Sequence, residues 1–117
     1  MIWKFITFLV RKLEPEVAHQ ISLIALKLGF HPRLKRIEIP VKINNLHFTN
    51  FLGVAAGFDK NAQIIESIHY LNFGLTEVGT ITPLPQYGNP KPRVFRLEKD
   101  KAIINRNGFN NLEWLRL

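Results

Sequence analysis

The 117-residue sequence contains no cysteine, which excludes a disulfide framework and a thiolate metal site. The sequence has four histidines, His19, His31, His47 and His69. No two of them have the close spacing that puts two metal ligands on one face of a helix. We therefore expect ordinary surface or core histidines and no metal site. The N-terminal apolar run is also too short and too interrupted for a membrane span or a signal peptide.

Acidic side chains are scarce: 9 Asp and Glu stand against 16 Lys and Arg, a net charge of +7. Residues 1–42 hold eight Lys/Arg and three Glu, so most of the positive charge lies in the first third of the chain. A basic segment beside a strongly apolar helix suits an anionic membrane surface at least as well as a phosphate backbone. Because no zinc-finger, aromatic RNA-binding or helix-turn-helix signature accompanies it, we expect no nucleic-acid partner; a solvated basic face remains the alternative.

The stretch at residues 52–61, LGVAAGFDKN, predicts a buried strand that runs into a polar turn. A helix-spaced apolar pattern follows at residues 64–71 and a second short strand at residues 75–78, so the three segments predict one βαβ unit. Parallel strands joined by a right-handed crossover point the same way, which places residues 57–60 and 79–80 on one face of the sheet. Barrels and open α/β sheets have their active sites on that face.

Two amphipathic helices are predicted before this unit. Residues 2–13 carry a wide apolar stripe opposite Lys4, Thr7 and Arg11, and residues 14–28 carry a second stripe that ends at Gly29. Their apolar faces are too broad to cover each other, which implies lipid, a long apolar ligand or another domain; packing on the main domain is an equally weighted alternative. The basic connector at residues 31–40 predicts a boundary between domains 1–40 and 41–117.

Two hairpins are predicted, at residues 41–48 and 94–104, with a stiff proline-rich excursion before the second. The second hairpin leads into residues 105–111, NRNGFNN, whose amides form an adaptable array of donors and acceptors. Another helix is expected to begin near Asn111. A single βαβ unit with hairpins does not close a parallel sheet, and an eight-stranded barrel needs about 250 residues, so the chain is expected to be part of a larger fold.

Four sequence motifs carry a resemblance to a known family: AAGFDKN at 55–61, EVGTITP at 77–83, GNPKPRVFR at 88–96 and INRNGFNN at 104–111. In this order and spacing they resemble the quinone-reducing, membrane-associated class of dihydroorotate dehydrogenase. The helix pair with LEPEVAH at 13–19 resembles the N-terminal extension that the soluble class lacks. There are departures at Asn107, where an apolar or aromatic residue is usual, and at Phe51, which replaces a common proline.

The resemblance implies an α/β fold: a two-helix membrane-associated module followed by the opening elements of a (β/α)8 TIM barrel that holds FMN. It implies oxidation of dihydroorotate to orotate in pyrimidine biosynthesis, with ubiquinone or menaquinone as acceptor, at the cytoplasmic face of a bacterial inner membrane. The flavin contacts that it implies are Ala56, Gly57, Phe58, Asp59, Lys60 and Thr80. The substrate contacts are Lys60, Asn105, Arg106, Asn107, Gly108 and Phe109, and the quinone tunnel residues are His19 and Arg96.

The catalytic base of this class is a serine on a later barrel loop, so the resemblance places the base downstream of Leu117 and no catalytic residue within this chain. The sequence is therefore interpreted as the N-terminal portion of such an enzyme, inactive by itself, with its oligomeric state left open. The alternative is a truncated, non-enzymatic product that retains only a membrane-surface-binding helical module. A nucleic-acid binder ranks third.

Overall fold

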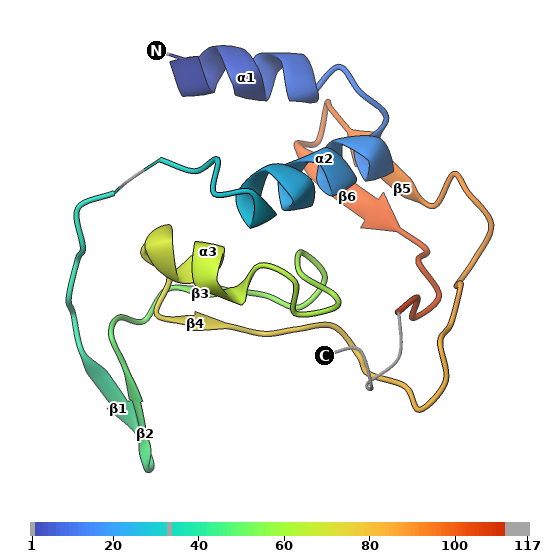
Figure 1. Ribbon diagram of the computed structural model, residues 1–117. Coiled ribbons are helices and arrows are strands. Elements are labelled where there is room, and N and C mark those ends of the chain that lie inside the picture. The colour runs from blue at the N-terminus through green and yellow to red at the C-terminus, as the bar shows by residue number, and fades with distance from the viewer. Residues whose placement is uncertain (1, 33, 112–117) are drawn as a thin grey trace.

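The structure is a computed structural model and describes residues 2–32 and 34–111 (Figure 1). Three two-stranded sheets form within these residues: β1 with β2 and β5 with β6 are antiparallel, and β3 with β4 is parallel. The elements are α1 (Ile2–Val10), α2 (Pro15–Lys27), β1 (Val41–Ile43), β2 (Leu46–Phe48), β3 (Gly53–Val54), α3 (Ile65–Tyr70), β4 (Leu75–Thr76), β5 (Val94–Leu97) and β6 (Ala102–Asn105). The predicted order of helices and strands is confirmed.

The N-terminal helices begin and end for local reasons. Glu14 caps α2, because its side chain accepts a 2.9 Å hydrogen bond from the Val17 N–H, and Pro15 occupies the first turn, where no N–H is needed. Gly29 follows the end of α2 with a φ of +80°, which glycine adopts without strain. The first helix ends at Val10 rather than at the predicted Leu13, because residues 11–13 form turns and a bend.

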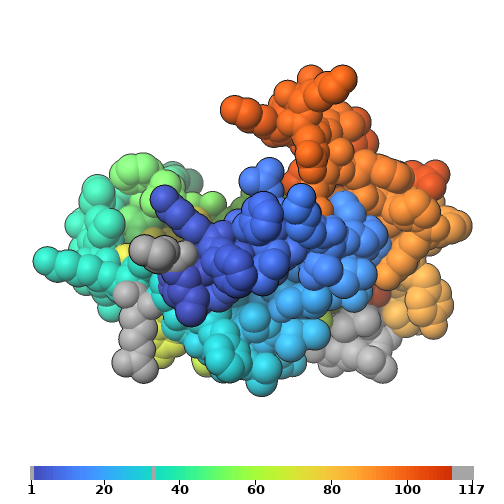
Figure 2. Space-filling model, turned by 90° about the horizontal axis from the view of Figure 1, so that it is seen from above, coloured from blue at the N-terminus to red at the C-terminus, as the bar shows by residue number. Residues whose placement is uncertain are grey.

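Burial separates the two helices. No residue of α1 is buried, and its apolar side chains include Ile2, Phe5 and Phe8, each more than half exposed. Figure 2 shows α1 lying on the outside of the molecule, and Figure 1 shows α2 between α1 and the β3–α3–β4 unit. In α2, Glu16 and Ala18 are buried, and the Leu26 carbonyl accepts a 2.7 Å hydrogen bond from the Ser67 hydroxyl of α3.

The predicted βαβ unit is confirmed, with Gly53 paired to Leu75 and Val54 to Thr76. Its small core is made by Ile64 and Ile68, each 2% exposed. Two expectations are wrong: the second strand ends at Thr76 rather than at residue 78, and β3 is not buried, since Leu52 beside it is 54% exposed. The reason is that a parallel sheet needs cover on both faces, whereas α3 is the one helix in the described part of the chain that packs closely on it.

Asn50 links the segments that lead into the two parallel strands. Its buried side chain accepts hydrogen bonds from the N–H groups of Leu52 and Gly74, and donates one to the Asn72 carbonyl. A Cβ on Gly74 would lie 2.1 Å from the Asn50 carbonyl oxygen, so only glycine fits there. This amide fixes the register that brings the carboxyl ends of β3 and β4 together.

Both predicted hairpins are confirmed. Asn44 turns the first with a φ of +54°, a conformation that asparagine tolerates. The second, β5–β6, pairs Val94 with Asn105 and extends one residue beyond its predicted end at residue 104. In Figure 1 it lies beside α2, and the long segment from β4 to β5 runs around the outside. The helix expected between Asn111 and Leu117 falls on residues 112–117, outside the described residues.

Candidate functional site

Two adjoining cavities lie at the carboxyl end of β3. The larger, of about 730 Å³, is lined by α2, the turn after β3 and the β5–β6 hairpin. The smaller, of about 430 Å³, is lined by the same turn, the segment after β4 and the loop at residues 105–110. Six residues line both cavities: Ala56, Gly57, Lys60, Asn105, Asn107 and Asn110. The expectation that residues 57–60 and 79–80 meet on one face is confirmed, since a Cβ on Gly79 would lie 3.1 Å from the Lys60 Cα.

Lys60 is the shared cation of the two cavities. Its ammonium donates a 2.6 Å hydrogen bond to the Asn110 amide oxygen, which fixes the side chain in the dividing wall. Burial lowers the pKa of Lys60, and the charge of Arg93 lowers it further, while Glu16 acts in the opposite direction. A partly desolvated ammonium with one amide partner is well suited to bind a carboxylate.

The turn after β3 presents backbone to the cavities. Gly57 has a φ of +112°, and a Cβ at this position would meet nothing within 4 Å. Asp59 differs from its neighbours, because it is fully buried and its two carboxylate oxygens accept 2.8 Å hydrogen bonds from the N–H groups of Gln63 and Ile64. Asp59 holds the turn that leads into α3 and lines neither cavity, so its flavin contact stays a prediction.

The predicted substrate loop lines the smaller cavity together with Thr80. Within it, the Asn107 side chain donates a 2.9 Å hydrogen bond to the Asn105 amide oxygen, and Phe109 is 70% exposed with a φ of +52°. Asn107, the departure from the family pattern, thus lies in the walls of both cavities. All five predicted loop residues lie together here: Asn105, Arg106, Asn107, Gly108 and Phe109.

The two predicted quinone-tunnel residues both line the larger cavity. His19 lies 2.6 Å through Nε2 from the Phe58 carbonyl oxygen, so this nitrogen donates, and its ring meets the Phe58 ring edge-to-face at 5.5 Å. Arg96 donates to the carbonyls of Arg11 (2.9 Å) and Leu13 (2.7 Å), at the corner between the two helices. Apolar side chains fill the wall between these polar groups: Leu23, Ile24, Val94 and Ile103.

A buried ion pair at the larger cavity was missed by the sequence analysis. Glu16 and Arg93 are 8% and 7% exposed, and the guanidinium Nη2 lies 2.6 Å from a Glu16 carboxylate oxygen. The hydrogen bond from Arg93 lowers the pKa of Glu16 against the opposing effect of burial. Both residues belong to motifs that carry the family resemblance, but they are 77 positions apart in the sequence. No local sequence pattern predicts a pair at that separation.

The chemistry of the smaller cavity is compatible with the planar anionic ligand and the flavin that the resemblance implies. Its lining residues include two cations, Lys60 and Arg106, and four asparagine side chains, but no acid. The small residues Ala56 and Gly57 leave backbone accessible, as close approach to a ring system requires. No cluster of three His, Cys, Asp or Glu side chains that could hold a metal occurs in residues 2–32 and 34–111.

The catalytic base is the part of the expected site that these cavities do not include. The resemblance places it downstream of Leu117, and Leu117 itself lies outside the described residues, which end at Asn111. The position of the base therefore stays a prediction. The residues that line the two cavities supply amide groups and positive charge.

The chain matches the family model described as dihydroorotate dehydrogenase over residues 38–114. It is 54% identical over 101 residues to the dihydroorotate dehydrogenase (quinone) of Bartonella henselae, covering 85% of this chain and 28% of the relative. The Erythrobacter litoralis protein of the same name is 49% identical over 113 residues, covering 95% of this chain and 33% of the relative.

A crystal structure of DHODH from Eimeria tenella in complex with ferulenol superimposes with a TM-score of 0.80 at 48% identity, over 85% of this chain and 27% of that one. The chain thus spans between 28% and 33% of the length of these two curated relatives. A family match over most of the chain agrees with identities near 50% and with the shared fold. The chain therefore belongs to the dihydroorotate dehydrogenase family.

Proposed function

We propose that this chain forms the N-terminal part of a quinone-dependent dihydroorotate dehydrogenase, which oxidises dihydroorotate to orotate in pyrimidine biosynthesis. The observation that carries the proposal is the pair of cavities that share Lys60: one is polar and cationic, and the other is walled by apolar side chains of α2 and the β5–β6 hairpin. An enzyme that passes electrons from a polar substrate to an apolar acceptor needs two such sites side by side. The names of the relatives agree with this assignment.

At the smaller cavity, the backbone at Ala56 and Gly57, together with Lys60 and Thr80, would hold FMN, which supplies the two-electron chemistry when bound. Phe58 lines the larger cavity and would reach the flavin from that side. The substrate contacts would come from Lys60, which binds the carboxylate, and from the loop amides, which match the amide edges of the pyrimidine ring. The base that removes the C5 proton would come from downstream of Leu117. The β3–α3–β4 unit would open a (β/α)8 barrel whose further elements cover the exposed strands.

The larger cavity would take the quinone. Leu23, Ile24, Val94 and Ile103 offer an apolar wall to an isoprenoid tail and ring, while His19 and Arg96 supply polar groups for the carbonyls. Both ubiquinone and menaquinone fit this description. Domain 1–40 and the β5–β6 hairpin of domain 41–117 would then share the quinone side, and domain 41–117 would contribute the flavin side.

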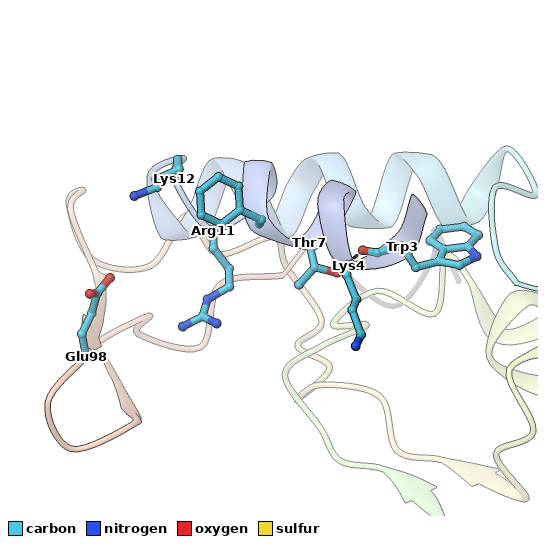
Figure 3. A pocket seen from close by; sticks show the side chains of 7 residues that line it. Trp3, Lys4, Thr7, Arg11, Lys12 and Glu98 are labelled. Atoms are coloured by element: carbon cyan, nitrogen blue, oxygen red, sulfur yellow. Dashed lines mark hydrogen bonds between the residues drawn. The ribbon is translucent and has the colours of Figure 1, made fainter. Parts of the chain in front are cut away.

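The exposed face of α1 supports attachment to an anionic membrane surface. Beside it lies an open groove of about 540 Å³ that Figure 3 shows along α1, with Lys4 and Arg11 extending from the helical side and Glu98 approaching from the β5–β6 turn. Lys12 lies 5.3 Å from the Phe8 ring centroid. No helix in the described part of the chain is long and apolar enough to cross a bilayer. We propose a peripheral location at the cytoplasmic face of a bacterial inner membrane.

A chimera tests the function, with this chain replacing the matching part of the Bartonella henselae enzyme. We expect it to retain FMN and to form orotate with a quinone acceptor. Lys60→Ala should lower turnover by about 10²-fold or more, since it removes charge stabilisation at the reacting groups, whereas the matched control Lys99→Ala, in the exposed hairpin turn, should not. A chimera with flavin but no orotate formation, or a fully active Lys60→Ala variant, would contradict the proposal.

The 117-residue chain alone should not oxidise dihydroorotate, because β3 and β4 cannot enclose a flavin. Mixing the chain with FMN, dihydroorotate and a quinone analogue should give orotate no faster than free flavin does. The second candidate function, a membrane-binding helical module without enzyme activity, is favoured by the absence of buried residues in α1. A chimera that binds vesicles but neither retains flavin nor forms orotate would support this second candidate.

A further inference from the structure

The buried pair of Glu16 and Arg93 ties α2 to the segment before β5. The Arg93 Nε lies 3.1 and 3.2 Å from the two carboxylate oxygens, and Nη2 lies 2.6 Å from one of them. This fork is directional, because a planar guanidinium binds a carboxylate in one orientation. A second cation, Lys91, is 59% exposed and lies 3.5 Å from the same carboxylate, so it adds charge but little direction.

The opposite edge of the same guanidinium holds a loop. Arg93 Nη1 donates to the Tyr87 carbonyl at 2.6 Å and to the Asn89 carbonyl at 3.2 Å. The Tyr87 side chain is 92% exposed, so the side chain does little to fix this loop. Arg93, which Glu16 orients, therefore contributes two hydrogen bonds that hold residues 87–89.

Residues 88 and 89 in turn contact the amide loop at the smaller cavity. The Asn89 N–H donates to the Asn107 carbonyl at 3.0 Å, and the Asn89 side chain donates to the Arg106 carbonyl at 2.7 Å. A Cβ on Gly88 would lie 2.0 Å from the Asn107 carbonyl oxygen, so the two loops are in close contact. An unbroken series of hydrogen bonds thus runs from Glu16 through Arg93 and Asn89 to the loop at residues 105–110.

We propose that Glu16 and Arg93 are positioning residues: from α2 they fix the amide loop at residues 105–110 in the geometry that binds the pyrimidine substrate. The inference rests on the proposed function for the identity of the substrate. The helix that walls the larger cavity thereby also sets the binding loop of the smaller one. Neither residue touches the substrate in this scheme, so both act through Asn89 and the Asn107 backbone.

The first test measures steady-state kinetics in the chimera with the Bartonella henselae enzyme. Glu16→Gln should raise the KM for dihydroorotate about tenfold and change kcat about threefold at most, because a displaced binding loop weakens substrate binding more than the chemical step. Arg93→Lys should have the same effect, since lysine keeps the charge but loses the fork. Lys91→Met, the matched control beside the same carboxylate, should leave the KM unchanged. Equal KM values in all variants would overturn the proposal.

A double variant separates positioning from stability. In Glu16→Leu/Arg93→Met the buried charges are replaced together by apolar side chains of similar size, so the melting temperature should return close to that of the parent. The KM should stay about tenfold high, because methionine has no donor for the Tyr87 and Asn89 carbonyls. If the KM recovers with the melting temperature, the pair serves stability alone and the proposal fails.

Amide hydrogen exchange of the 117-residue chain tests the same inference without catalysis. The Asn89 N–H should exchange at least about tenfold faster in the double variant than in the parent, while the Ile68 N–H, which donates to the Ile64 carbonyl in α3, should keep its rate. Unchanged exchange at Asn89 would overturn the proposal. An inactive parent chimera with faster exchange at Asn89 would instead show that the proposed function is wrong and the positioning correct.

Discussion

The two N-terminal helices have similar amphipathic sequences but different surroundings. α1 buries no residue, and Arg96 ties the corner that follows it to the hairpin through two backbone carbonyls. α2 is held on several sides: by the Glu16–Arg93 pair, by the hydrogen bond from Ser67 to the Leu26 carbonyl, and by His19 against Phe58. The apolar pattern is common to both helices, and polar side chains decide which of them packs.

The comparison assigns different roles to the two helices. The sequence left lipid and packing as equal alternatives for the pair taken together. In the structure, α2 forms a wall of the larger cavity and buries Glu16 and Ala18, whereas no residue of α1 is buried. We therefore propose that the membrane-facing role belongs to α1.

The largest expected effect concerns the stability of α2. Glu16→Gln should lower the free energy of unfolding by about 3–5 kcal/mol, since it leaves the buried Arg93 charge without its partner. The matched change in α1, Thr7→Ala, should cost about 0.5 kcal/mol or less because the site is exposed. Urea unfolding of the two variants measures the difference. Equal losses in the free energy of unfolding would show that the two helices are not held differently.

Acid should remove the stabilisation that the Glu16–Arg93 pair gives to α2. The pKa of Glu16 lies below its ordinary value of 4.5 in the folded chain, so the unfolded chain binds the proton more readily. The stabilisation is therefore fully present above pH 4.5 and is lost as the pH falls through the lower folded-state pKa. Unfolding free energies measured from about pH 7 to about pH 3 should fall less steeply for Glu16→Gln. Parallel profiles for variant and parent would contradict this assignment.

Vesicle binding should depend on the apolar face of α1. Phe5→Ser with Leu9→Ser should abolish most binding to anionic vesicles, because each side chain contributes about 1.5–3 kcal/mol when it leaves water. The control Ile21→Ser, on the partly exposed side of α2, should bind normally. Trp3 fluorescence on adding vesicles reports the interaction. Equal losses of vesicle binding in the α1 and α2 variants would show that both helices contact the membrane.

The smallest expected effect comes from the cations beside the groove along α1. Lys4→Gln and Arg11→Gln should each weaken vesicle binding by about 1 kcal/mol at low salt, with little effect at high salt. Glu98→Gln should strengthen binding slightly, because Glu98 is the acid among the groove residues. Salt titrations of vesicle binding measure all three, and a salt-independent loss would show that the charges are not in contact with the surface.

Local patterns predicted the elements well, and contacts distant in the sequence explain the rest. The turn at Gly57, the hairpin at Asn44 and the start of α2 at Pro15 each depend on the conformational preference of one residue, which the sequence shows directly. The burial of β3 was predicted wrongly, because apolar strands are buried only where other elements cover them.

The candidate site shows the same division. Resemblance to a family identified Lys60, His19, Arg96 and the amide loop, and all of them line the two cavities. It did not separate Asp59, whose side chain holds the turn into α3, from the cavity-lining residues around it. The Glu16–Arg93 pair was missed because an ion pair across the fold follows no periodicity.

Hydrogen exchange of the two helices, with and without anionic vesicles, tests the central distinction most directly. Without vesicles, amides of α2 should be protected and those of α1 should exchange faster, since α2 has buried residues and α1 has none. Vesicles should slow exchange in α1 and leave α2 unchanged. Equal protection of both helices without vesicles, or protection of α2 alone when vesicles are added, would contradict the account.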